Sequence, residues 1–377
     1  MKKTIYFIID TMGVGGAETQ LLRIIPHLRK FDWDIRLITI KDKNEFTAEL
    51  EKAGVSCSSL AYGTSFPKFT GNVRKLAAEI NETKKENQVV IHSHIVSSNL
   101  FSRFLTLFLK GKTVLVNTVH NTNEGYSLRY LMYKITRNRA QYVSAMSQAA
   151  LEVHRKKKAS RPDRLHLVYN GIDLEHFKKN VEVRDKMRER FSLNSEFAWL
   201  AVGNLSPQKN FTNLLRAWKL LLQNSDLKAR LYIVGDGVEK EMLQEKITQE
   251  KLDGSATLLG RRNDVQDLMN MADGYVMSSD WEGFPMVLLE SAATELPIVA
   301  TEVGGNSEIV RHGESGYICQ PKSEQSLAKA MQGLMAQTAP ELQEMGRIGR
   351  EHVQKNFSVE SIAKQWNGIY ETLLKDN

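Results

Sequence analysis

Cysteine is scarce in this chain of 377 residues: it has two, Cys57 and Cys319, far apart in the sequence. Two isolated thiols supply neither a disulfide framework nor the spacing of a cysteine metal site, so we expect both to be small core residues. Long apolar runs are missing as well. The longest, in NLFSRFLTLFLKGK, is broken by Arg103 and ends at Lys110, well short of the roughly 20 residues that a membrane-spanning helix needs.

The beginning of the chain lacks the pattern of an export signal. MKKTIYFIID is basic and then apolar, but the apolar run stops at Asp10 and is too short for the core of a signal peptide. These absences predict a cytoplasmic protein. With 42% hydrophobic and 25% charged residues, the composition is typical of a globular protein, and the length suits two domains better than one.

Acidic residues are few in one region. Between Arg103 and Arg164 there are thirteen Lys or Arg residues and three acidic ones, although the net charge of the whole chain is +7. Helical spacing in RYLMYKITRNRAQ and the leucine before it places apolar residues on one side and basic residues around the other. The apolar residues are Leu128, Leu131, Met132 and Ile135, and the basic ones are Arg129, Lys134, Arg137 and Arg139. A core-facing helix with a solvated basic back explains one such segment. A cluster of this size beside LFSRFLTLFL favours a surface that binds anionic lipid or nucleic-acid phosphates.

Short apolar runs alternate with longer helix-like segments along the whole chain. The expected strands are residues 4–10, 34–40, 88–94, 113–119, 141–146 and 164–170, then 198–204, 230–237, 256–260, 274–279, 297–301 and 316–320. Such alternation predicts parallel sheets covered by helices on both faces. These strands are too many for one compact sheet, so the expected fold class is α/β with two doubly wound, Rossmann-like domains.

The seam between the domains is expected within residues 170–190, which are polar and charged. The predicted N-terminal domain covers residues 1–175 and the C-terminal domain residues 176–357. Residues 358–377 read as one amphipathic helix with Ser358 as its N-cap, and we expect it to pack back on the N-terminal domain.

Doubly wound domains bind ligands at the carboxyl ends of their strands, and a glycine-rich loop is expected there after the first strand. Gly13, Gly15 and Gly16 in DTMGVGGAE permit a close approach of the backbone to an anion at a helix N-terminus. Glu18 takes the place of the last glycine in a dinucleotide fingerprint, so this is not an NAD site. A second glycine motif, VGDG, is explained by a turn before a helix.

Two further loops carry side chains of interest. Lys209 follows a strand in VGNLSPQKN, where a cation could bind phosphates, although a lone lysine is more often a surface residue. His120 ends a predicted strand in TVHNTNEG. A lone histidine is usually structural, but at the carboxyl end of such a strand a ligand-facing role is equally expected.

The segment SSDWEGFPMVLLESAATE holds two glutamates, Glu282 and Glu290. A strand ends at Ser279, and Pro285 stands near the first turn of a helix, where its missing N–H has no cost. Glu282 then lies in the loop and Glu290 about one and a half turns into the helix, which argues against a shared acid–base pair. Metal-binding partners are missing too. What remains is two hydroxyl-binding carboxylates with backbone N–H groups between them that suit phosphate.

Together these motifs resemble the GT4-type retaining glycosyltransferases (glycosyltransferase group 1), which have the GT-B fold. The matching segments are GVGGAE, VH at His120, VYNGID, VGNLSPQKN, IVGDG, LLGRRNDV, EGFPMVLLE and TEVGGNSEIV, in the family's order and over nearly the whole chain. The glutamate pair with GFP inside it, followed by VGGNSE, is specific, whereas the glycine turns alone are not. The resemblance implies two Rossmann-like domains that face a central cleft, with the sugar nucleotide held mainly by the C-terminal domain and the acceptor by the N-terminal one.

The resemblance also implies roles for single residues. Glu290 would accept hydrogen bonds from the ribose, Glu282 would hold donor-sugar hydroxyls, and Lys209 would bind the diphosphate. His120 would lie near the transferring sugar, and the loop of Arg262 would pass the base. The implied catalytic residues are His120, Glu282 and Lys209, and the implied donor-binding residues are Gly15, Gly16, Asn204, Lys209, Arg262, Glu282, Gly283, Phe284, Pro285, Met286, Val287 and Glu290.

One position departs from the family pattern. Asn204 stands where the family commonly has arginine, so one expected cation on the leaving diphosphate is missing. We expect Lys209 and the helix N-terminus to carry this charge. No metal ligand and no cofactor is expected, because the nucleotide sugar is a substrate and no DxD-type cluster lies in a suitable turn.

The implied reaction moves a hexose or N-acetylhexosamine, with retention, from a nucleotide-diphosphate sugar to a hydroxyl of a glycan or lipid-linked acceptor. UDP is expected as the nucleotide by analogy, and the context by bacterial surface polysaccharide or lipopolysaccharide synthesis. His120 would orient the donor and not act as a covalent nucleophile. The basic surface would hold the enzyme on the anionic inner face of the cell membrane.

Two other interpretations stay open. The chain could be a GT-B relative with different chemistry, such as a sugar-nucleotide epimerase or a phosphorylase. It could also be a basic protein that binds a membrane or a nucleic acid without transfer activity. A nucleic-acid partner is not expected, because aromatic and basic residues are not interleaved on a sheet face.

Overall fold

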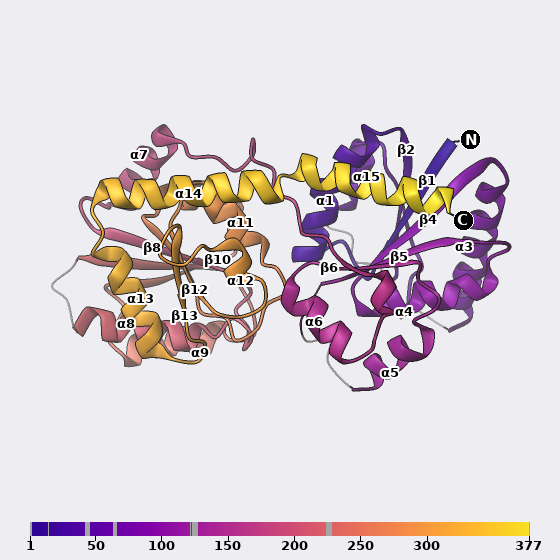
Figure 1. The fold of residues 1–377 in the computed structure, drawn as a ribbon. Helices are drawn as coiled ribbons and strands as arrows, with labels where there is room; N and C mark the ends of the chain where they lie inside the picture. The colour runs from indigo at the N-terminus through magenta and orange to yellow at the C-terminus, as the bar shows by residue number, and fades with distance from the viewer. Residues whose placement is uncertain are drawn as a thin grey trace. The chain divides into compact units, whose positions relative to one another are not determined.

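The computed structural model describes residues 2–13, 15–41, 46–62, 66–120, 122, 127–223 and 228–376. The chain divides into two compact units (Figure 1). One comprises Met1–Gly171 together with Val359–Asn377, and the other comprises Ile172–Ser358. The boundaries expected from the sequence, at 175/176 and 357/358, lie a few residues from these.

The first unit contains, within its described residues, a seven-stranded parallel sheet in the order β3-β2-β1-β4-β5-β6-β7. Its strands are β1 (Lys2–Ile9), β2 (Trp33–Thr39), β3 (Ser56–Ser59), β4 (Asn87–His94), β5 (Val114–Val119), β6 (Tyr142–Ala145) and β7 (Leu165–Leu167). Its helices are α1 (Gly16–Arg29), α2 (Thr47–Lys52), α3 (Phe66–Glu86), α4 (Val96–Leu105), α5 (Ser127–Thr136), α6 (Gln148–Lys156) and α15 (Val359–Lys375), with 3-10 turns η1 (Thr106–Phe108) and η2 (Pro162–Arg164).

Strand β1 shows why this sheet is buried on both faces. Ile5, Phe7 and Ile9 belong to one core cluster, whereas Tyr6 and Ile8 between them belong to the cluster on the opposite face. Successive side chains of a strand point to opposite faces of the sheet, so a continuous apolar run supplies two cores at once.

Helix α15 completes the core of the first unit. Figure 1 shows it beside α1, and the two helices are in contact. Trp366 and Tyr370 of α15 are buried in the same cluster as Phe7. Trp33 Nε1 donates a hydrogen bond to Asn367 Oδ1 at 2.7 Å, which ties the helix to the start of β2.

The second unit contains, in its described residues, a six-stranded parallel sheet in the order β10-β9-β8-β11-β12-β13. Its strands are β8 (Phe197–Val202), β9 (Ala229–Val234), β10 (Ala256–Gly260), β11 (Gly274–Met277), β12 (Ile298–Thr301) and β13 (Gly316–Cys319). Its helices are α7 (Val181–Arg190), α8 (Phe211–Gln223), α9 (Lys240–Gln249), α10 (Val265–Met271), α11 (Met286–Ala293), α12 (Asn306–Ile309), α13 (Glu324–Met335) and α14 (Ala339–Phe357).

Each strand expected from the sequence is present, and the prediction of two doubly wound α/β domains is confirmed. Strand β3 is additional. Its sequence SCSS has no β-branched or aromatic residue. It lies at the edge of the sheet, where a strand forms hydrogen bonds with a single neighbour, here β2. Cys319 is buried as expected, whereas Cys57, on this edge strand, packs against the core of the first unit and is only partly buried.

Candidate functional site

The loops at the carboxyl edge of the second sheet pack against one another through their backbones. Leu205 N donates to Asp236 O at 2.9 Å, which joins the loop after β8 to the loop after β9. Gly235 has φ +147°, and a Cβ there would lie 1.9 Å from Gly203 O. Only glycine fits this position, so the VGDG motif holds two site loops together.

Lys209 and Glu282, two of the predicted site residues, form an ion pair. Lys209 Nζ lies 2.6 Å from Glu282 Oε1, and Ser279 Oγ donates to the same oxygen at 2.6 Å. Gln208 Nε2 donates to the other oxygen at 3.5 Å. Only 5% of Glu282 is exposed, so its charge is stabilised by the ammonium and by these hydrogen bonds instead of by water.

Further hydrogen bonds join the two loops that carry this pair. Ser278 Oγ donates to Lys209 O at 2.8 Å, and Asp280 N donates to Gln208 O at 2.9 Å. Asn210 Nδ2 donates to Asp280 Oδ1 at 2.7 Å. The two loops that carry Lys209 and Glu282 are therefore held together by backbone and side-chain hydrogen bonds.

The turn into α11, residues 283–287, offers a ligand its backbone. Pro285 is the N-cap residue of α11, and no side chain in the described part of the chain caps the first turn. Phe284 and Met286 are buried, and the ring of Phe284 packs against Phe357 with centroids 5.3 Å apart. Because these side chains point inward, the N–H groups at the helix N-terminus are what the turn presents, and they favour an anion.

The VGG motif packs against the backbone of this turn. Gly305 N donates to Gly283 O at 2.9 Å. Gly304 has φ +56°, and a Cβ there would lie 2.3 Å from Glu282 O. A side chain at Gly304 would therefore displace the backbone that carries Glu282.

Glu290 and Glu282 both act on Tyr275 of β11. Burial raises the pKa of Tyr275 well above its ordinary value, and the carboxylates of Glu290 and Glu282 raise this pKa further. The neutral phenol donates to Val202 O at 3.1 Å, which ties β11 to the end of β8. Both glutamates thus influence one buried tyrosine, and Glu282 lies in the loop and Glu290 in the helix, as predicted.

Asn204 and Arg262 occupy other loops of the same unit. Asn204 is exposed in the loop after β8. Arg262 follows β10 and donates from Nε to Asp264 Oδ1 at 2.8 Å and from a terminal nitrogen to Asp264 Oδ2 at 2.5 Å. This bidentate pair lowers the pKa of Asp264. The guanidinium of Arg262 is therefore held within its own loop.

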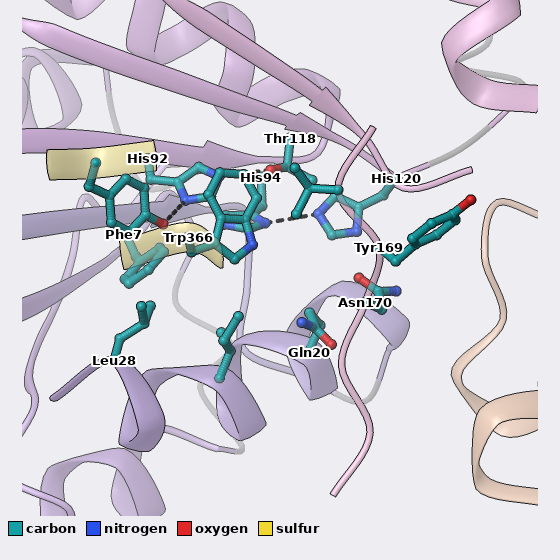
Figure 2. Close-up of a pocket in the computed structure, with 13 residues that line it drawn as sticks. Phe7, Gln20, Leu28, His92, His94, Thr118, His120, Tyr169, Asn170 and Trp366 are labelled. Atoms are coloured by element: carbon teal, nitrogen blue, oxygen red, sulfur yellow. Dashed lines mark hydrogen bonds between the residues drawn. The ribbon is translucent and has the colours of Figure 1, made fainter. Parts of the chain in front are cut away.

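In the first unit, His120 follows β5 and is buried among residues of two strands. His120 Nε2 lies 2.9 Å from Nδ1 of His94, the last residue of β4 (Figure 2). Thr118 and His120 are two positions apart, as are His92 and His94, so each pair lies on the same side of its strand. Together with Asn170, Gln20 and Trp366, among others, these residues line a small cavity of ≈ 10 Å³, about the size of one water molecule.

A chain of hydrogen bonds continues from this cavity into the core. Tyr370 OH lies 2.7 Å from His92 Nδ1, and His92 Nε2 lies 2.7 Å from Thr118 Oγ1. Thr118 Oγ1 in turn lies 2.7 Å from Ser144 Oγ. Burial raises the pKa of Tyr370 well above its ordinary value, so this side chain remains a phenol that can donate to His92.

The three histidines are neutral at ordinary pH. Burial lowers the pKa of His120 to about 3. Burial also lowers the pKa of His92 and of His94 well below the usual value, and the neighbouring histidines add to the effect. A neutral imidazole has one N–H donor and one acceptor, so each ring can pass a hydrogen bond in one direction.

Gly15 and Gly16 begin α1. Gly15 is the N-cap, with an extended backbone that any residue could adopt, and no side chain of the described residues caps it. A Cβ on Gly15 would lie 2.4 Å from Glu18 Oε2, so the space above the helix N-terminus is shared with this carboxyl. Burial raises the pKa of Glu18. Val14, between the glycines of this loop, lies outside the described residues.

The partners of the predicted site residues carry little signal in the sequence. His92, His94, Ser279, Gln208 and Tyr370 all contact a predicted site residue or its neighbour. The signal for the histidines was present in IHSH: two polar aromatic residues at a spacing of two, on one face of a strand that is otherwise apolar.

A surface with unusual exposed apolar residues lies over α4, η1 and α5, and we call it the α4–α5 surface. Its exposed apolar side chains are Phe104, Leu107, Phe108, Leu128, Leu131, Met132 and Ile135. Ile135 is 69% exposed and Leu128 66%, so the alternative that this side of α5 faces the core is wrong. Arg129, Lys134 and Arg139 of the same segment are exposed as well. Beneath it, the buried Arg103 donates to Tyr133 O at 3.1 Å and joins α4 to α5.

Among the residues that the structure describes, no helix is both long and apolar enough to cross a bilayer. Within the same residues, no group of three His, Cys, Asp or Glu side chains is placed to hold a metal ion.

Comparison with known proteins agrees with these features. Residues 14–176 match the model of Glycosyltransferase Family 4, and residues 183–352 match that of Glycosyl transferases group 1. N-acetyl-alpha-D-glucosaminyl L-malate synthase of Bacillus anthracis is 27% identical over 313 residues, covering 80% of this chain and 80% of that protein. UDP-Gal:alpha-D-GlcNAc-diphosphoundecaprenol alpha-1,3-galactosyltransferase of Escherichia coli is 26% identical over 331 residues, covering 85% and 84%.

A solved structure has the same fold. Anabaena HepE, crystallised in complex with UDP, superimposes with a TM-score of 0.85 at 22% identity, covering 98% of this chain and 100% of HepE. The motifs, the two parallel sheets and the matches to both halves of the chain give one conclusion: this protein belongs to the GT4 family of glycosyltransferases with the GT-B fold.

Proposed function

We propose that the protein is a retaining glycosyltransferase that moves a hexose or an N-acetylhexosamine from a nucleotide-diphosphate sugar to a hydroxyl group. The observation that carries the proposal is the buried Lys209–Glu282 pair beside the N-terminus of α11. A carboxylate accepts hydrogen bonds from sugar hydroxyls, and an ammonium group and backbone N–H groups suit a diphosphate.

Lys209 can serve both parts of the donor. Its ammonium group has three N–H donors, and the contact with Glu282 uses one of them. The other two are available for the diphosphate as negative charge develops on it in the transition state, where such stabilisation contributes most to rate. Because Asn204 is neutral, Lys209 and the N-terminus of α11 carry this role here.

The reaction breaks the bond between the anomeric carbon and the diphosphate oxygen and forms a bond from that carbon to the acceptor oxygen on the same face. The departing diphosphate takes the proton of the acceptor hydroxyl, which balances the step without a protein base. His120 orients the donor sugar and forms no covalent bond with it. No divalent metal takes part in the proposed step.

UDP is the proposed nucleotide. The Escherichia coli relative is named for a UDP-galactose donor, and HepE was crystallised with UDP. A thermal-shift panel of UDP-, GDP- and ADP-sugars tests this, with stabilisation by a UDP-sugar as the expected result. Glu290→Ala should abolish that stabilisation through loss of the ribose contact, whereas Glu314→Ala, an exposed acid of the same unit, should retain it. An unchanged affinity of Glu290→Ala for the nucleotide would remove the ribose assignment.

The stereochemistry and the metal requirement are tested on the product. Retention predicts that the anomeric configuration of the donor is found in the product by NMR. Full activity in excess EDTA is expected. Inversion, loss of activity in EDTA, or epimerised or hydrolysed sugar without transfer would each contradict the proposal.

The proposed acceptor is a lipid-linked glycan at an anionic membrane. The α4–α5 surface supports this, because exposed apolar side chains beside exposed basic ones suit the boundary between headgroups and acyl chains. Two relatives are named for diphospho-undecaprenol acceptors. The Bacillus anthracis relative is named for L-malate, so a small acceptor at an enzyme free in solution is the competing version.

Vesicle sedimentation separates the two versions. We expect binding to anionic vesicles that falls as salt is raised, and weak binding to neutral ones. Ile135→Asp should reduce the binding, whereas Val238→Asp, an exposed apolar residue of the other unit, should not. Equal binding of both vesicle types, or no effect of Ile135→Asp, would favour the small acceptor.

A further inference from the structure

His94 contacts His120 but has no role in the proposed reaction. It is buried, and its Nδ1 lies 2.9 Å from His120 Nε2. Its other ring nitrogen, Nε2, is buried and has no hydrogen-bond partner in the part of the chain that the structure describes. A buried polar atom without a partner in a native protein calls for an explanation.

The short contact between the rings has two possible directions. Either His94 Nδ1–H donates to His120 Nε2, or His120 Nε2–H donates to His94 Nδ1. In the first case the buried Nε2 of His94 is a bare acceptor, and in the second it is an N–H donor without a partner. Buried N–H groups without a partner are rarer than unsatisfied acceptors, so the first direction is favoured.

The direction of this hydrogen bond decides what His120 offers a ligand. If His120 accepts at Nε2, its proton resides on Nδ1. Nδ1 is the nitrogen of His120 that is not engaged with His94. Figure 2 shows this second nitrogen on the side of Tyr169 and Asn170, away from His94. His120 would then present a hydrogen-bond donor at the cavity.

We infer that His94 is a positioning residue that holds His120 in the Nδ1–H tautomer, so that His120 donates a hydrogen bond to an oxygen of the substrate. The identification of the substrate as a donor sugar rests on the proposed function. An imidazole in this state cannot remove the acceptor proton at Nδ1, which agrees with transfer of that proton to the departing diphosphate.

The neighbours of His94 hold its ring in place for this task. The His92 ring lies 4.2 Å from the His94 ring, and Phe7 packs on it at 5.8 Å. His92 is itself held at both nitrogens, by Tyr370 and Thr118. A ring packed in this way cannot turn to offer Nε2 instead, so Nδ1 is fixed as the atom that faces His120. The direction of the contact then follows from the buried Nε2, which is better left as a bare acceptor than as an N–H without a partner.

The tautomer of His120 can be measured without any substrate. Two-bond 1H–15N correlation spectra of the histidine-labelled protein show which nitrogen carries the proton, and loss of a signal in His120→Gln assigns it. We expect the Nδ1–H tautomer in the wild type. His94→Phe keeps the aromatic packing but removes the donor, and should give His120 a mixture of tautomers or the Nε2–H form. His94→Asn should restore Nδ1–H, because the asparagine amide can donate from a place near that of Nδ1.

His166→Phe is the matched control, because His166 is a histidine of the same unit that packs on Tyr142 and does not contact His120. It should leave the His120 spectrum unchanged. A wild-type His120 with its proton on Nε2, or a His94→Phe spectrum like that of the wild type, would overturn the inference. Neither outcome depends on transfer activity, so failure of the proposed function would not be mistaken for failure here.

A second experiment measures the rate of sugar transfer, once a donor nucleotide sugar has been identified. We expect His94→Phe to lower kcat about tenfold, the size of one lost hydrogen bond in the transition state, with little change in the affinity for the nucleotide. His94→Asn should recover most of this loss. Equal losses in His94→Phe and His94→Asn would show that His94 acts only through packing and would contradict the positioning role.

Discussion

Replacing Lys209 with methionine should destabilise the second unit by about 3 kcal/mol. The side chain of Glu282 is 7% exposed and that of Lys209 17%, so removal of the ammonium leaves a buried carboxylate without its counter-charge. Breaking a buried pair at one partner costs about 3–5 kcal/mol. The hydrogen bonds from Ser279 and Gln208 remain and keep the expected cost at the lower end of this range.

Lys219→Met is the matched control for this variant. Lys219 lies on α8 and pairs with Glu250, but the two side chains are 43% and 28% exposed. Exposed pairs contribute up to about 1 kcal/mol, because water and salt screen their charges. The same chemical change in the same unit should therefore cost much less than at Lys209.

The assay must report on the second unit alone, because a chain with two units need not unfold in a single step. Amide hydrogen exchange of peptides from α8 and β11, measured as a function of urea, gives the free energy of opening of this unit. The double variant Lys209→Met with Glu282→Gln should be more stable than Lys209→Met by about 1 kcal/mol or more, because the neutral amide no longer needs a counter-charge. The reasoning would be refuted if Lys209→Met came within about 0.5 kcal/mol of Lys219→Met, or if Glu282→Gln gave no recovery.

Three further predictions follow from the same structure. Because burial lowers the pKa of His120 to about 3, this side chain stays uncharged in the folded protein while the unfolded chain takes up a proton below about 6.5. The first unit should lose stability as pH falls from 6.5 towards 3, and His120→Asn should make that slope smaller in urea titrations at pH 7 and 5, while His92 and His94, whose pKa values burial also lowers, keep the rest of it. Gly304→Ala should destabilise the second unit by about 3 kcal/mol and weaken nucleotide binding, because a Cβ would lie 2.3 Å from Glu282 O at a positive φ, whereas Gly254→Ala, with no atom within 4 Å of its Cβ, should do neither in the same thermal-shift assay. Tyr370→Phe should cost the first unit about 1–2 kcal/mol by leaving His92 Nδ1 without its donor, and exchange protection of β4 no lower than in the wild type would contradict the assignment of that hydrogen bond.

The interplay of local pattern and packing is clearest in the two glutamates. Strand, turn and helix signals placed Glu282 in a loop and Glu290 in a helix, and the structure has both there. The same signals could not show that Glu282 is buried against Lys209, because the two residues are 73 positions apart in the chain. Nor could they show that Gly304 leaves room for the Glu282 backbone. Both facts depend on how three separate loops meet at one edge of the sheet.

The histidines of the first unit also depend on distant parts of the chain for their contacts. The place of His120 at the end of a strand marks it in the sequence, whereas His92 and His94 lie within the strand 88–94, where nothing local gives them a role beyond that of other residues of a buried sheet. Their meaning comes from the neighbouring strand and from α15, which brings Tyr370 to His92 from the far end of the chain. Edge strand β3 was not predicted, because its short polar sequence SCSS has no local pattern of a strand.

The sequence itself determined the order of strands and helices and the two-domain α/β class, because burial on two faces leaves a pattern within each short segment. It also determined the family, because the motifs stand at fixed spacing. The pairing of Lys209 with Glu282, the contact of His94 with His120 and the exposure of the apolar side of α5 were decided by the tertiary structure. Hydrogen bonds and ion pairs form only within about 3–4 Å, and such distances depend on strand register, loop geometry and side-chain rotamers contributed by distant parts of the chain.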